Sequence, residues 1–126
     1  MEVQKEVRIF HGIVLFGMRL LDKYIKEKVK EYKEMAENPK ETFTILRKEN
    51  LALLERESYH IHETIKKIEE INIHQFKTPE EYKEYLLNLF KEFYKQQGSP
   101  PACYNIFKEK LEICWQFYNE FHKEAV

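Results

Sequence analysis

The sequence predicts an all-α protein that folds as an antiparallel up-down four-helix bundle with two long and two shorter helices. Apolar residues recur every three or four positions through four long stretches, which is the pattern of helices with one buried face. The 126 residues include only three glycines and four prolines, so the chain has few places at which a helix can end. At this length one core is expected, and residues 1–126 are predicted to form a single domain.

The first helix is predicted over residues 2–37. Apolar residues follow one face along its whole length, and over residues 9–18 they extend around most of the circumference. That width indicates a position at the centre of the bundle, in contact with two or more neighbours. Gly12 and Gly17 lie in the same stretch. Because glycine inside a helix costs about 1 kcal/mol relative to alanine, we expect another helix to approach closely at both.

The second helix is predicted to begin at Pro39 and to end near Ile73. Asn38 precedes a proline at the first helical position and Glu41 at the third, an arrangement that satisfies the free amide groups of a helix start. Its apolar face is predicted to consist of Phe43, Leu46, Leu53, Leu54, Ile61, Ile65 and Ile68.

The third and fourth helices are predicted over residues 79–97 and 101–123. Thr78 before Pro79 repeats the capping pattern, and the run Gly98-Ser99-Pro100-Pro101 interrupts any helix that reaches it. The third helix carries its apolar residues at Tyr82, Leu86, Leu89, Phe90 and Phe93. The fourth has Phe107, Leu111, Cys114, Tyr118 and Phe121 in near-heptad order, widened by Ile106, Ile113 and Phe117.

The predicted helices are unequal in length. At 1.5 Å per residue the first two reach up to about 50 Å and the last two about 28 to 35 Å. The first hairpin is therefore expected to project beyond the second and to leave an apolar end uncovered. A second copy of the chain would cover it, so we expect a homo-oligomer, most simply a dimer.

The charge balance limits the classes of partner. Lys and Arg total 21 against 22 Asp and Glu, a formal net charge of −1. A protein that tracks phosphates normally carries a basic excess, so nucleic acid is not favoured. Charged residues are nevertheless abundant at 34%, and with few glycines this resembles the composition of thermophile proteins.

The location of the protein is predicted to be cytoplasmic, without a membrane anchor. The polar start of the chain does not resemble a signal peptide. The longest apolar run, residues 9–21, is interrupted by His11 and Arg19 and is shorter than the roughly 20 residues that span a bilayer. Cys103 and Cys114 are the two cysteines, and we expect both to be reduced core thiols.

Glu57 and His60 have the Glu-x-x-His spacing that turns a carboxylate and an imidazole toward one metal ion. The run from Leu53 to His60 resembles the corresponding segment of ferritin-like di-iron proteins. That resemblance implies an iron site, or a site for another divalent metal, although the chain has no second Glu-x-x-His motif. Two chains of a dimer would then complete the site together.

The nearest acid to this motif is expected to be Asp22. Folding the first hairpin at residues 38–39 puts His60 opposite roughly Gly17, and Asp22 lies little more than one turn beyond. The candidate metal ligands are therefore Glu57, His60 and Asp22.

Arg56 and His62 form an Arg-x5-His pair, which is similar to the Arg-x4–6-His pattern of HEPN ribonucleases. Those proteins are also small all-helical dimers, and the resemblance implies RNA cleavage by these two residues from both chains. On an unbroken helix, however, side chains six positions apart diverge by about 120°.

No other combination of residues in the sequence predicts an enzyme. The cysteines lie among apolar residues, and no glycine-rich loop could hold a phosphate. We therefore expect a non-catalytic helical interaction and oligomerisation protein that binds another macromolecule. The metal-binding bundle and the HEPN-like ribonuclease are the two alternatives.

Overall fold

The computed structural model describes residues 2–37, 44–97 and 101–125, and every regular element within those ranges is helical. This confirms the all-α prediction. The expected start of the second helix at Asn38 and Pro39 and the apolar residue Phe43 lie outside the described residues, as do the side chains of Leu46 and Cys103. The helices are α1 (Glu2–Glu37), α2 (Thr44–Glu69), the 3-10 turn η1 (Ile73–Gln75), α3 (Pro79–Gln97) and α4 (Pro101–Ala125).

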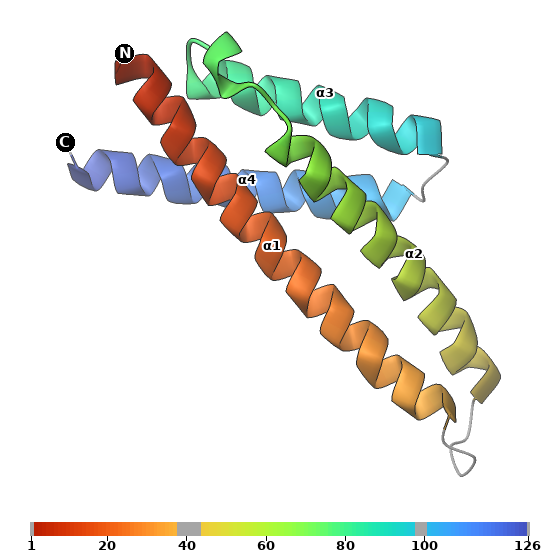
Figure 1. The fold of residues 1–126 in the computed structure, drawn as a ribbon. Coiled ribbons are helices and arrows are strands. Elements are labelled where there is room, and N and C mark those ends of the chain that lie inside the picture. The colour runs from red at the N-terminus through yellow and green to blue at the C-terminus, as the bar shows by residue number, and fades with distance from the viewer. Residues whose placement is uncertain (1, 38–43, 98–100, 126) are drawn as a thin grey trace.

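The four main helices form two hairpins that cross. Figure 1 shows α1 and α2 side by side, lying diagonally over the hairpin of α3 and α4. The amino-terminal half of α1 and the carboxyl-terminal half of α2 lie over the second hairpin, whereas their other halves extend beyond it. Within the described residues α1 contains 36 residues, α2 26, α3 19 and α4 25, so α4 is about as long as α2.

Local side chains set the turn between α2 and α3. The Thr78 hydroxyl accepts a hydrogen bond from the backbone N–H of Glu81 at 3.2 Å, and the Glu81 carboxylate accepts one from the N–H of Lys77 at 2.9 Å. This is the reciprocal cap that the sequence predicts for the start of α3. Before it, α2 ends at Glu69, a few residues earlier than expected, and the Asn72 side chain caps η1.

The densest part of the core is an aromatic cluster where α1, α3 and α4 meet. Phe10 of α1 is fully buried, and its ring centroid lies 5.6 Å from that of Tyr82, 5.1 Å from Trp115 and 5.4 Å from Tyr118. Phe76, just before α3, packs edge-on against Tyr82 at 5.3 Å. Such pairs contribute roughly 0.5–1.5 kcal/mol each beyond the area they bury. This cluster fixes the amino-terminal half of α1 on the second hairpin.

Candidate functional site

His60 is a core histidine on α2. Its side chain is 4% exposed, and its ring lies edge-on to the rings of Phe93 and Tyr94 on α3, at centroid distances of 6.5 and 6.1 Å. Burial, and then the nearby charge of Arg56, lower the pKa of His60 below its ordinary value. Glu57, one turn earlier, is partly buried, and this burial raises the pKa of its carboxyl group. In both groups burial disfavours the charged form.

Asp22 lies on α1, where it interacts with its own helix. Its Oδ2 atom accepts a hydrogen bond from Lys26 at 2.8 Å, while Oδ1 is buried without a hydrogen-bond partner among the described residues. The ion pair with Lys26, one turn along the same helix, gives the Asp22 carboxylate a structural role. Among the observed contacts of the described residues, none joins Asp22 to Glu57 or His60.

The register of the first hairpin differs from the predicted one. Arg19 of α1 forms an ion pair with Glu69 of α2 at 3.2 Å. With Gly17 opposite His60, as predicted, Arg19 and Glu69 would lie eleven residues, or about 16 Å, apart along the axis, too far to pair. The observed pairing places the level of Asp22 nearer the carboxyl-terminal end of α2 than predicted.

No metal centre forms within the part of the chain that the structure describes: no three His, Cys, Asp or Glu side chains cluster there. A metal site that Glu57, His60 and Asp22 form together with a second chain stays a prediction. Arg56 and His62 are both exposed on α2, as expected for His62, and the ribonuclease pairing likewise stays a prediction.

Two buried polar pairs account for side chains that the sequence left open. His11 Nδ1 and the Tyr82 hydroxyl share a hydrogen bond, and burial lowers the pKa of His11. Thr64 donates to the carbonyl of His60 at 2.7 Å and also meets the Tyr94 hydroxyl. Because a threonine has only one hydroxyl hydrogen, Tyr94 is the donor in that second bond. These groups have structural partners.

The feature best suited to binding is an apolar groove of about 460 Å³ between α1 and α4. One charged residue, Lys110, is among the side chains that line it. The sequence assigned residues 9–18 to the centre of the bundle, whereas the structure leaves Phe16 of that stretch exposed at the groove. The lining residues are Ile9, Gly12, Ile13, Phe16, Gly17, Leu20, Lys110, Ile113, Cys114 and Phe117.

The two glycines of α1 differ in their surroundings. A Cβ atom at Gly17 would lie 2.8 Å from Cys114 Sγ and 3.3 Å from Lys110 Cε, so glycine is needed there for α4 to approach. A Cβ at Gly12 would have no neighbour within 4 Å. The predicted close approach is therefore right for Gly17 and wrong for Gly12. Gly12 leaves space in the groove that no described residue fills.

Cys114 lies at the junction of the groove and the core. Its thiol is 3.8 Å from the backbone carbonyl of Ile13, to which it can donate a weak hydrogen bond. Burial raises the pKa of this thiol, although the Lys110 ammonium opposes the change. A protonated, buried thiol is a poor nucleophile. The prediction of a reduced core thiol is confirmed for Cys114.

Large apolar side chains surround the groove and remain open to solvent. Because they sit on both helices, they form one continuous outer apolar face rather than isolated exposed residues. The feature of the sequence that indicated this face is the width of the apolar arcs on α1 and α4. The outer apolar face consists of Phe16 (66% exposed), Leu20 (48%), Ile113 (57%), Phe117 (59%) and Phe121 (51%).

Comparison of the chain with protein-family models, with curated protein sequences and with solved structures finds no match. Among the described helices, none has an apolar stretch long enough to cross a bilayer. The outer apolar face and the side chains around it are therefore the features of the molecule that bear on its function.

Proposed function

We propose that this chain is a non-catalytic helical interaction protein that binds another protein through the outer apolar face of α1 and α4. The observation that carries the proposal is the exposure of large apolar side chains, each about half or more uncovered: Phe16, Leu20, Ile113 and Phe117 line one groove, and Phe121 follows one turn further along α4. Monomeric proteins rarely expose larger contiguous apolar patches than a few hundred Å², and such patches mark interaction sites.

Gly12 supports the same proposal. A glycine in the middle of a long helix lowers its stability by about 1 kcal/mol relative to alanine, and no neighbour within the chain needs the space. A partner side chain seated in the groove at Gly12 would use it. An apolar groove between two helices is the usual receptor for the apolar side chains of a partner helix.

The inner polar groups support a non-catalytic function. His11 and Thr64 are hydrogen-bonded to core groups, the His60 ring packs against Phe93 and Tyr94, and burial lowers the pKa of both histidines. We propose a cytoplasmic location as well, which agrees with the free thiol of Cys114. The up-down order of a bundle with two long and two shorter helices also stays part of this proposal.

A photoreactive side chain tests the interaction. We would replace Phe117 by benzoylphenylalanine and irradiate the purified chain, alone and in extract from the source cells. Tyr59 on α2, exposed to a similar extent at 56%, is the matched control position. Protein adducts are expected at position 117 and not at position 59, and they should disappear when Phe16→Glu is added on the facing helix. The absence of protein adducts at position 117 contradicts the proposal.

The metal-binding alternative has a separate test. Metal content of protein purified without added metal should be measured for wild type and for Glu57→Ala, with iron or another divalent metal as the expected cofactor of a ferritin-like site. A stoichiometric metal that is lost in the variant would favour this alternative. The HEPN-like alternative predicts RNA cleavage that is lost in His62→Ala.

A further inference from the structure

We propose that the occupant of the outer apolar face is a second copy of this chain, related by a two-fold axis that places α1 of one copy on α4 of the other. This inference rests on the proposed function, which says only that the face binds a protein. It identifies the partner and the arrangement, and three observations support it: area, charge and spacing.

The area is sufficient for a dimer. A large aromatic side chain carries roughly 150–250 Å² of surface, so the five half-exposed side chains present an apolar area on the order of 500 Å². A self-complementary contact would remove that area from both copies. With the surrounding polar edge, the total reaches the roughly 1,200–2,000 Å² of a stable interface.

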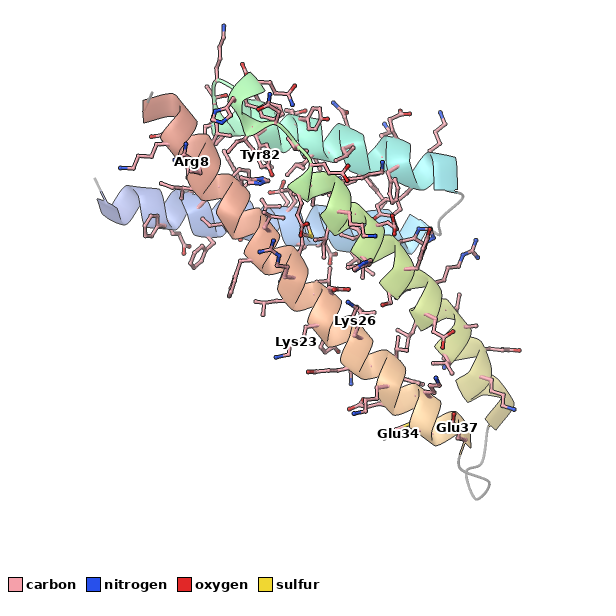
Figure 2. The ribbon with its side chains drawn as sticks, viewed as in Figure 1. Arg8, Lys23, Lys26, Glu34, Glu37 and Tyr82 are labelled. Carbon is pink, nitrogen blue, oxygen red and sulfur yellow. The ribbon has the colours of Figure 1, made fainter. Side chains whose placement is uncertain are left out.

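The two edges of the face carry opposite charges. The edge on α1 that lies away from α4 is basic, with Lys5, Arg8, Arg19 and Lys23 exposed there. Figure 2 shows Arg8 near the amino-terminal end of α1, and Lys23 on the side of the helix away from α2. The far edge of α4 is acidic, with Glu109 and Glu120 exposed. Projected at 100° per residue, these side chains border the groove on its two sides.

These charges distinguish between two possible dimers. A two-fold axis across the groove places α1 on α1, and so sets basic edge against basic edge and acidic against acidic. An axis along the groove places α1 on α4, and each basic edge then meets the acidic edge of the other copy. Like charges brought together at an interface are unfavourable, so the second arrangement is preferred.

The spacing of the charges matches this arrangement. Phe10 meets Tyr118, while Gly17 meets Cys114, so α1 and α4 run in opposite directions along the groove. Arg8 lies two residues before Phe10, and Glu120 lies two residues after Tyr118. A two-fold axis parallel to the groove leaves the position of each residue along the groove unchanged. It therefore brings Arg8 of one copy level with Glu120 of the other.

A second pair matches in the same way. Arg19 lies nine residues after Phe10, and Glu109 lies nine residues before Tyr118. Arg19 already pairs with Glu69 in its own chain, but that pair is exposed and its side chains can exchange partners at small cost. Arg8 and Arg19 are thus separated by three helical turns, as are Glu109 and Glu120. Both Arg–Glu pairs can form together, and the two-fold axis makes each of them occur twice.

Charge reversal tests the partner and the arrangement together. In the proposed dimer, Arg8→Glu brings two carboxylates together and Glu120→Arg brings two guanidinium groups together, so each variant alone should dissociate at least about tenfold more readily at low salt. An equimolar mixture of the two variants restores an opposite-charge contact. Sedimentation equilibrium should therefore show a heterodimer in the mixture, at concentrations where each variant alone is monomeric. Lys91→Glu on α3, also exposed, is the matched control and should dimerise as wild type does.

Each outcome decides something. A dimer that Arg8→Glu strengthens would show α1 on α1 and overturn the arrangement. A wild type that stays monomeric at several hundred micromolar overturns the inference altogether. If position 117 then still forms adducts with a different protein, the proposed function survives without the dimer. Circular dichroism of every variant should remain that of wild type, because both substituted residues are exposed.

Discussion

Two apolar regions lie on opposite sides of the contact between α1 and α4, and they differ in what covers them. The inner one, centred on Phe10, is closed: Tyr82, Trp115 and Tyr118 surround that ring, and none of its surface is exposed. The outer one, centred on Phe16 and Phe117, is also built from large apolar side chains of α1 and α4, yet both of these rings are more than half exposed. Helical spacing and composition alone do not distinguish them.

The two regions differ because α1 has more apolar surface than the other described helices cover. A helix with a single apolar face needs one layer of neighbours, whereas α1 has apolar residues around most of its circumference between residues 9 and 18. The chain supplies the inner layer through α2, α3 and α4. It has no further element among the described residues for the outer side, so that side is available to a partner.

Truncating one aromatic ring from each region should have very different effects. Phe10→Ala leaves a cavity among three rings, those of Tyr82, Trp115 and Tyr118, and should lower the free energy of unfolding by about 3–5 kcal/mol. Phe16→Ala removes a ring that is 66% exposed and should change the stability of the monomer by less than about 1 kcal/mol. Urea unfolding followed by circular dichroism at low protein concentration measures both. Similar losses would show that the outer face is also packed within one chain.

The two glycines provide a finer comparison. Gly12→Ala should stabilise the monomer by about 0.4–1 kcal/mol, because it favours the helix and meets no neighbour. Gly17→Ala should be destabilising by about 1 kcal/mol, since the added methyl group overlaps Cys114 Sγ.

The Gly17 effect has an internal control. Removing the sulfur with Cys114→Ala should turn Gly17→Ala from destabilising to neutral or stabilising in that background, as a double-mutant cycle would show. A Gly17→Ala that destabilises equally in both backgrounds would mean that the thiol is not the atom that requires glycine.

The buried histidines should make stability depend on pH. Burial lowers the pKa of His11 and of His60 in the folded chain, so below the ordinary value of 6.5 the unfolded chain binds more protons. Stability is therefore full above pH 7 and should fall as the pH drops from 6.5 toward the lowered values. His60→Gln should flatten this dependence, which urea unfolding at a series of pH values measures. An equal slope for His60→Gln and wild type would place the proton uptake elsewhere.

The smallest expected effect concerns the edge of the inner cluster. Lys83 lies over the Trp115 ring at 5.0 Å and pairs with Glu112 at 2.8 Å. Lys83→Met keeps the apolar stem and loses the charge, and it should cost about 0.5–1 kcal/mol. Thermal unfolding at low and high salt measures the change, which should shrink at high salt. A cost that is insensitive to salt would indicate lost packing instead.

Much of the local structure followed from the sequence because local physics determines it. The ends of α3, the cap at Thr78 and the buried His11 depend on neighbours within a few residues or on a single face. The crossing of the two hairpins and the register that pairs Arg19 with Glu69 depend on how the loops close, which helical periodicity does not encode.

The candidate site was predictable only in part. The wide apolar arcs predicted for residues 9–18 and for the fourth helix contained Phe16, Ile113, Phe117 and Phe121 but not Leu20, and coverage is a property of the whole fold. Gly12 and Gly17 look alike in sequence and differ only in whether Cys114 lies above them. The Glu57 and His60 motif was conspicuous in the sequence, yet His60 packs against Phe93 and Tyr94.

The most direct test of the two regions is carbene footprinting of the wild-type protein as a function of its concentration. At low concentration Phe16 and Phe117 should be labelled strongly, and Phe10 and Phe107 should be protected. As the concentration rises, labelling of Phe16 and Phe117 should fall, while the exposed Tyr59 should be labelled equally throughout. Labelling of Phe16 and Phe117 that does not change with concentration, or labelling of Phe10 as fast as that of Phe16, would contradict the account.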